Sequence, residues 1–280
     1  AFNYVIATYP YASLIDETRI WRAKTNIRLD NDKLAIETLK IVLNKAGLPD
    51  KIKEQAHTAL AMAYVKTDSI QNAIEHLKLA TKTEENEEQF TRNTFVLGQI
   101  FASESKKDSA ILTFQKVTNY KKAPLKFKIH AQLEIAKMAT DSLVSPMLLS
   151  FEKLLKDREY KVYHSAMYYQ MAMLEGKRDS LVNAIDFLNK SIQVKNATSM
   201  QKTYAYEKLG NLQFDHANFV KAGAYYDSVI QLSKTSTEKR IRSIRRRRKS
   251  LTSLINFETT LQNNDSILRI VKMPKEAQKG

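Results

Sequence analysis

The chain of 280 residues contains 45 Lys and Arg against 30 Asp and Glu, which gives a formal net charge of +15. Only six Gly and five Pro are present and Cys is absent, so helix is favoured almost everywhere, and disulfides, thiolate metal sites and cysteine nucleophiles are excluded. No apolar run approaches the roughly 20 residues that span a bilayer, and the positive charge indicates acidic or anionic partners.

The first predicted element is incomplete. Residues 1–9 are interpreted as the second helix of a truncated hairpin, ended by Pro10. We therefore expect the chain to be a fragment whose true amino terminus and any targeting signal lie elsewhere. Six helical hairpins follow, predicted at 13–45, 50–82, 86–119, 124–156, 161–194 and 198–233. Residues 236–271 are predicted to form a seventh, longer and atypical pair of helices.

A repeat of 37 or 38 residues underlies these hairpins. Its anchor is a small or apolar residue in the second helix: Ala35, Ala73, Ala110, Met147, Ala184 and Ala222. Four positions later stands a large apolar residue: Leu39, Leu77, Phe114, Phe151, Leu188 and Tyr226. Twelve positions before each anchor stands a small or apolar residue: Ala23, Ala61, Gly98, Ile135, Ala172 and Gly210. Such a period is typical of stacked repeats, in which facing small residues let two helices approach closely.

Asp-Ser pairs mark the expected turns. Asp68-Ser69 and Asp179-Ser180 stand at matching places in two repeats, and the pair returns at residues 108–109, 141–142 and 265–266. An Asp or Ser side chain can accept the free backbone N–H groups of a first helical turn. We expect these pairs to form hairpin turns and to cap the following helices.

The repeat resembles the tetratricopeptide repeat. The copies that carry the resemblance best are Leu97-Gly98, Phe101, Ala110 and Phe114, and Tyr206, Leu209-Gly210, Ala222 and Tyr226. The resemblance implies an all-α fold: a right-handed α-α superhelix of about six hairpins, with a truncated first unit and an atypical last one. It also implies two parts, a repeat array at 1–233 and a basic closing helix and tail at 234–280.

A narrower resemblance rests on local segments. Residues 9–22, the Asp-Ser turns, and the segments 245–251 and 264–269 are similar to the SprE/PorW lipoproteins, which belong to the type IX secretion and gliding machinery of Bacteroidota. This resemblance implies an outer-membrane lipoprotein that faces the periplasm and links the secretion translocon to the periplasmic ring. The lipidated Cys of that family is not in the chain.

No set of residues with catalytic or metal-binding spacing is found. The five His are scattered over different repeats, and His57 and His130 fall near packing positions of first helices. The carboxylates at 84–88 are interpreted as a solvated helix start. We therefore expect no enzyme, no cofactor and no metal.

Two candidate binding surfaces remain. The repeat positions that line the concave side of such arrays form what we call the wall: Lys24, Thr58, Met62, Gln99, Gln132, Tyr169, Met173, Tyr204, Glu207 and Asn211. Glu207 stands where a clamp for a peptide's terminal carboxylate would need Lys, so we expect an extended segment or helix of a larger partner instead. The second surface, the basic strip, comprises Arg240, Arg242, Arg245, Arg246, Arg247, Arg248 and Lys249.

Three interpretations of the basic strip stay open. It is a solvated outer face, a docking site for an acidic protein, or a site for the phosphates of nucleic acid or lipid. Two functions follow. The first is a non-catalytic scaffold that binds protein partners, with any membrane attachment supplied by an anchor outside the chain. The alternative is a nucleic-acid-binding helical-repeat protein that uses the strip.

Overall fold

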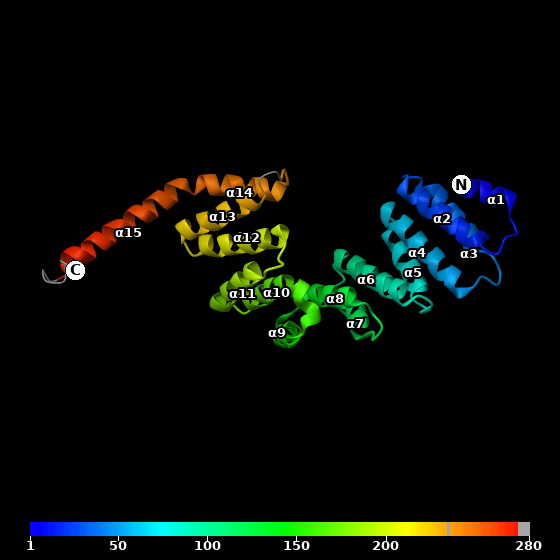
Figure 1. Ribbon diagram of the computed structural model, residues 1–280, viewed down its shortest axis with the longest axis horizontal. Coiled ribbons are helices and arrows are strands. Elements are labelled where there is room, and N and C mark those ends of the chain that lie inside the picture. Colours follow the sequence, from blue (N-terminus) through cyan, green and yellow to red (C-terminus); the bar gives the residue numbers. More distant parts are fainter. Residues whose placement is uncertain (234–235, 274–280) are drawn as a thin grey trace. The chain divides into compact units, whose positions relative to one another are not determined.

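The computed structural model describes residues 1–233 and 236–273, and all regular structure in this part is helical (Figure 1). It divides into two compact units, one from Ala1 to Met138 and the other from Ala139 onward. Within each unit, helices that follow one another in sequence pack against each other. The prediction of an all-α repeat fold is confirmed.

The first unit contains eight helices. They are α1 (Phe2–Thr8), α2 (Ile15–Arg28), α3 (Asp32–Leu43), α4 (Asp50–Lys66), α5 (Ile70–Ala80), α6 (Glu87–Ser103), α7 (Lys107–Asn119) and α8 (Leu125–Met138). The short α1 packs on α2.

The described residues of the second unit form seven α-helices and a 3-10 helix, η1. They are α9 (Asp141–Lys156), η1 (Arg158–Tyr163), α10 (His164–Lys177), α11 (Leu181–Gln193), α12 (Ser199–Asp215), α13 (Phe219–Leu232), α14 (Lys239–Ser250) and α15 (Thr252–Lys272). Five of the six predicted hairpins coincide with packed helix pairs inside a unit, namely α2–α3, α4–α5, α6–α7, α10–α11 and α12–α13. The division between the units falls inside the hairpin predicted at 124–156, between α8 and α9.

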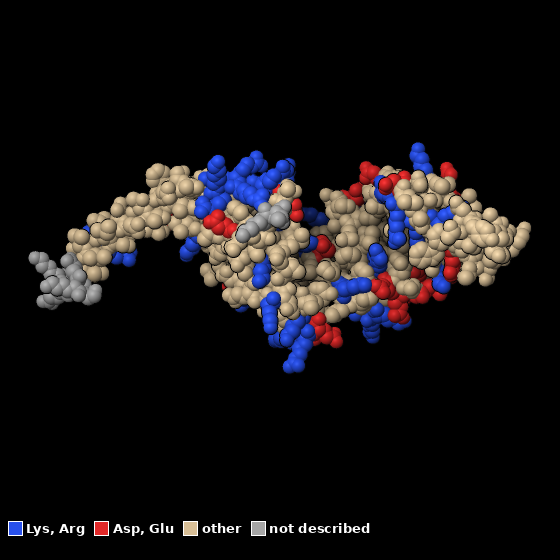
Figure 2. Space-filling view, turned by 45° about the horizontal axis from the view of Figure 1, so that its top comes forward, with Lys and Arg blue, Asp and Glu red and all other residues tan. Residues whose placement is uncertain are grey.

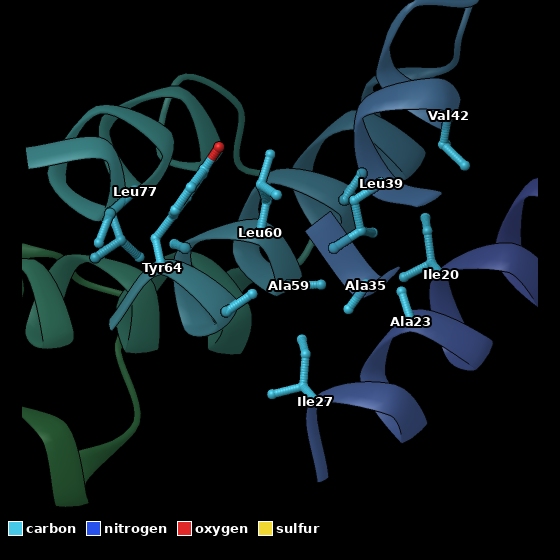
Figure 3. Packing of buried hydrophobic residues seen from close by; sticks show 14 of the residues in the cluster. Ile20, Ala23, Ile27, Ala35, Leu39, Val42, Ala59, Leu60, Tyr64 and Leu77 are labelled. Carbon is cyan, nitrogen blue, oxygen red and sulfur yellow. The ribbon is translucent and has the colours of Figure 1, made fainter. Parts of the chain in front are cut away.

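Every anchor of the repeat is buried, and so are its partners four positions later and twelve positions earlier. Figure 3 shows the first such interior, where Ala23 of α2 and Ala35 and Leu39 of α3 point into one apolar cluster that α4 also enters. Burial of this periodic stripe is the main force that holds each hairpin together, because isolated helices of this length are marginal in water.

The small residue of the first helix is matched to the large residue of the second. Gly98 of α6 lies against the ring of Phe114 on α7, and a Cβ at Gly98 would stand 2.8 Å from a ring carbon. Gly210 of α12 lies in the same way against Tyr226 on α13, where the corresponding distance is 2.6 Å. The repeats with Ala in place of Gly have Leu in place of the aromatic residue. Ile135 of α8 is the exception, since a large residue stands where the other repeats have Gly or Ala. The boundary between the two units follows at Met138.

The hairpin turns share one backbone conformation. A single residue takes a positive φ in five of them: Asp30, Asp68, Ser105, Asp179 and Ala217. The next residue then donates its N–H to the carbonyl five positions earlier, as in the bond from Ser69 to Tyr64 of 2.8 Å. This is the Schellman arrangement that ends a helix.

The expected capping by Asp-Ser pairs is wrong. Ser69 and Ser180 do stand at the N-cap positions of α5 and α11, but neither side chain makes a capping hydrogen bond. Asp68 and Asp179 instead supply the positive φ, which Asp tolerates better than most residues because its short polar side chain bonds locally. Asp265 and Ser266 lie within α15 and not in a turn.

The atypical last pair consists of two helices laid end to end, joined at Leu251, rather than a hairpin (Figure 1). Both contact α13. Ile255 near the start of α15 lies where a Cβ on Gly223 would point, and Glu258 accepts a hydrogen bond of 2.9 Å from the backbone N–H of Val220. The rest of α15 has no buried residue. The parts predicted at 1–233 and 234–280 remain a prediction, and residues 234–235 and 274–280 lie outside the described residues.

Candidate functional site

The wall residues of the second unit come together on α10 and α12. Tyr169 and Met173 of α10 pack on the apolar cluster that α12 shares. The rings of Tyr169 and Tyr204 meet edge to face, with centroids 6.5 Å apart, and burial raises the pKa of Tyr169. Glu207 and Asn211 lie one and two turns beyond Tyr204 on the same side of α12. Half of the predicted wall is therefore one continuous surface.

Helix α14 extends this surface with two Arg side chains. The guanidinium of Arg240 lies 4.2 Å from the ring centroid of Tyr204 and forms an ion pair with Glu207. Its Nη2 also donates to Thr203 Oγ1 at 3.5 Å. Stacking and pairing together hold Arg240 in one orientation, because a planar guanidinium satisfies both at once.

The second side chain, Arg247, is held by polar groups. Its Nη1 donates to Asn211 Oδ1 at 2.7 Å and to Tyr226 Oη at 3.4 Å. The hydroxyl of Tyr226 donates to the same Asn211 oxygen at 2.8 Å. Burial raises the pKa of Tyr226, so this hydroxyl keeps its proton near neutral pH.

An open groove of about 410 Å³ lies over these contacts. It is lined by Glu207, Asn211, Lys239, Arg240, Ser243, Ile244 and Arg247. The groove combines a fixed carboxylate, an amide and two oriented guanidinium groups beside exposed aromatic surface. Such a lining suits backbone and polar side chains of a peptide better than a small apolar ligand.

Arg240 and Arg247 were assigned by sequence to the basic strip and not to the wall. Counting one repeat of 37 residues forward from Asn211 reaches Arg248, directly beside Arg247. That count is a signal that α14 follows α12 in the repeat, although Arg248 itself pairs with Asp227 on α13 and its neighbour Arg247 faces the groove.

The wall residues of the first unit do not form a comparable surface. Lys24 lies 4.6 Å from the ring centroid of Trp21, and burial, followed by the charge of Arg28, lowers its pKa. Thr58 is buried, donates to the carbonyl of Glu54 and accepts from Asn93 Nδ2, both at 2.8 Å. Met62 and Gln99 are exposed on α4 and α6, and Gln132 is half-buried on α8. Thr58 thus serves packing between helices and offers no group to a partner.

The structure divides the basic strip by role. Arg240 and Arg247 turn into the groove beside the wall residues Glu207 and Asn211. Arg245 donates to the carbonyls of Ser236 and Ser233 at 3.1 and 3.0 Å, and Arg248 pairs with Asp227 on α13 at 2.9 Å. The remaining three, Arg242, Arg246 and Lys249, are exposed on α14.

The closest pair of titratable rings is in the first unit. His57 on α4 and His76 on α5 approach to 3.0 Å between their Nδ1 atoms, and His76 stacks on Tyr64. Burial, followed by the charge of His76, lowers the pKa of His57 to about 4. The two rings are neutral at pH 7 and fill space between the helices. Across residues 1–233 and 236–273, no three His, Asp or Glu side chains converge as a metal site would require.

None of the helices in the described ranges has both the length and the hydropathy needed to cross a bilayer.

Comparison with known proteins agrees with this architecture. The tetratricopeptide repeat model matches residues 54–87, which contain most of α4 and all of α5. The apo form of RapI is 14% identical, with a TM-score of 0.72 over 94% of this chain and 77% of RapI. YrrB, described as a TPR protein with an unusual peptide-binding site, is 12% identical, with a TM-score of 0.52 over 73% of this chain and 97% of YrrB.

A tetratricopeptide repeat protein from Parabacteroides merdae is similar as well. It is 13% identical, with a TM-score of 0.54 over 87% of this chain and 88% of its own. No curated protein matches the chain in sequence. These likenesses show that the fold is a tetratricopeptide-repeat fold.

Proposed function

Because the chain has a tetratricopeptide-repeat fold, we propose that it is a non-catalytic scaffold that holds protein partners. The observation that carries this proposal is the groove between α12 and α14. Its polar groups are oriented before any partner arrives, since Glu207 and Asn211 already fix the two guanidinium groups. Binding then loses little side-chain entropy at these positions. The peptide-binding site named for YrrB supports the same use of the fold.

The more specific proposal is an adaptor of the type IX secretion system. In this role the chain is the repeat module of an outer-membrane-associated protein on the periplasmic side, linking the secretion translocon to the periplasmic ring in secretion and gliding motility. The support is the local resemblance of residues 9–22, 245–251 and 264–269 to the SprE/PorW lipoproteins.

A pull-down with purified translocon and ring components tests both the scaffold proposal and the more specific adaptor proposal. The wild-type chain should retain a component at low salt, and Tyr204→Ala should weaken retention because it removes the aromatic face under Arg240. Tyr160→Ala is the matched control, since Tyr160 lies in η1 outside the groove. If no component is retained at low salt, the adaptor proposal is refuted. If Tyr204→Ala and Tyr160→Ala retain the component equally, the groove is not the binding site.

The alternative of nucleic-acid binding rests on the net charge and the basic strip. It requires binding to RNA or DNA that weakens steeply with salt and is lost when residues 245–248 are changed to Ala. Three of those four Arg side chains are bonded to protein atoms, namely Arg245, Arg247 and Arg248. A circular dichroism melt of that variant is therefore needed before its loss of binding is interpreted.

A further inference from the structure

Four cations lie along one side of α14. Lys239, Arg242, Arg246 and Lys249 are spaced by three, four and three residues, which places them in one row on a helix surface. With a rise of 1.5 Å per residue the row is about 15 Å long. Figure 2 shows the Lys and Arg side chains gathered over this helix. We call these four residues the ridge.

The ridge points away from the core of its own unit. Ile241 and Ile244 face α13 and are buried, while Arg240 and Arg247 turn into the groove with α12. The angular position of the ridge on α14 is opposite to the two isoleucines, because each residue advances the helix by about 100°. Lys239 also lines the edge of the groove, whereas Arg242, Arg246 and Lys249 lie outside it.

The ridge has no acidic counterpart in the described part of the chain. No ion pair or side-chain hydrogen bond within residues 1–233 and 236–273 involves any of its four side chains. Glu238, the nearest acid in sequence, is exposed and pairs with none of them. Some exposed lysines elsewhere are paired, as in Lys122 with Glu87 and Lys190 with Asp186. Exposed Lys153 and Lys156 are in no ion pair with a described residue, so it is the row of four cations on one helix face that sets the ridge apart.

The row is a set of like charges that repel one another, because residues three or four apart are neighbours on a helix surface. Mixed charges on this face would keep the helix equally soluble without this repulsion. Carboxylates from another molecule would neutralise the row.

The lining of the ridge indicates which anion it fits. An open groove of about 520 Å³ runs among Lys239, Arg242, Arg245 and Arg246. Guanidinium groups bind carboxylates through two parallel hydrogen bonds. No aromatic side chain lies between residues 236 and 250 on which a base could stack. At about 3.3 Å per residue, roughly five residues of extended chain cover the row.

We infer that Lys239, Arg242, Arg246 and Lys249 form a second docking surface, which binds an acidic segment of a protein partner. The inference rests on the proposed scaffold function, and three of its four residues, Arg242, Arg246 and Lys249, lie outside the groove. A partner held in the groove of α12 and α14 and a second segment on the ridge would contact opposite sides of α14.

The test measures fluorescence anisotropy of a labelled oligoglutamate peptide with the full chain at increasing salt. The variant R242Q/R246Q should weaken binding severalfold, up to about thirtyfold, and flatten the salt dependence, because two charged contacts are lost. The control K153Q/K156Q removes the same charge from exposed positions of α9 and should change affinity less than about twofold.

Equal weakening by both variants would overturn the inference, since net charge alone would then explain binding. Tighter binding of a single-stranded oligonucleotide of equal charge would also overturn it in favour of nucleic acid. The groove variant Tyr204→Ala should bind oligoglutamate like the wild type. A failed pull-down of secretion components therefore leaves this result unaffected, and the two proposals fail separately.

Discussion

The contact between Gly98 and Phe114 yields the sharpest prediction. In Gly98→Ala the new Cβ would stand 2.8 Å from the Phe114 ring, closer than a relaxed contact allows. Forcing a methyl group into a packed interior costs about 1–3 kcal/mol, whereas Ala gains roughly 0.5–1 kcal/mol over Gly within a helix. The expected net loss is about 1 kcal/mol, because the extremes of the two effects combine to roughly 0 and 2.5 kcal/mol. Gly210→Ala should lose more, because Tyr226 is nearer and its hydroxyl is bonded to Asn211.

Urea titration followed by circular dichroism at 222 nm measures these changes as shifts of the unfolding midpoint. Gly176→Ala is the control, because no atom lies within 4 Å of its Cβ position, and it should stabilise by about 0.5–1 kcal/mol. Phe114→Leu added to Gly98→Ala recreates the pair that Ala61 and Leu77 form and should recover part of the loss. Additive effects in this double-mutant cycle, or a Gly98→Ala chain as stable as the wild type, would refute the packing argument.

Three further predictions concern the turn before α13, the His pair and the groove. Ala217→Gly should stabilise by about 0.5–1 kcal/mol in urea titration, because Ala217 has a φ of 58° that Gly adopts without strain. Stability should fall as pH drops from 6.5 toward 4, because burial lowers the pKa of His57 to about 4 and the unfolded chain therefore binds protons first; thermal melts at pH 7 and pH 5 measure it. Glu207→Ala should lower the melting temperature, because Arg240 loses its carboxylate partner while it stays partly buried.

Each of these three has its own control. Ala224→Gly, at an exposed helical position of α13, should destabilise the protein by about 1 kcal/mol. If Ala217→Gly also destabilises it, the strain argument at Ala217 is contradicted. His57→Gln should reduce the difference between the two pH values, and an unchanged difference would assign it to other groups. Glu258→Gln alters a carboxylate of the same unit outside the groove, and if it matches Glu207→Ala the groove pair contributes nothing specific.

Much of the architecture follows from the period of small and large residues. That pattern identifies the buried stripe of each helix, so the hairpins and the Gly–aromatic contacts were predictable. The turns were less so. Ala217 has no preference for a positive φ, yet it takes the same place as Asp68 and Asp179, because packing of the two helices imposes the turn. The side-chain caps that the Asp-Ser pairs predicted were wrong for the same reason, because helix packing and not the capping side chain determines the turn.

The site was only partly predictable, and the cause is the length of the Arg side chain. Hydrophobic periodicity shows that Ile241 and Ile244 face inward. It cannot show to which side a long flexible guanidinium turns. Arg240 and Arg247 turn toward α12, Arg245 and Arg248 bond to the residues before α14 and to α13, and Arg242, Arg246 and Lys249 are exposed. The end-to-end arrangement of α14 and α15 was missed because the pattern identifies helices without the angle between them.

The pairing of sequential helices has a consequence for synthesis of the protein. Within a hairpin, Gly98 contacts Phe114 and Gly210 contacts Tyr226, and each pair is separated by only sixteen residues in sequence. Such contacts become available as soon as the two helices have left the ribosome, well before translation ends. The growing chain can therefore bury its apolar stripe hairpin by hairpin, and each finished hairpin offers a template on which the next one condenses.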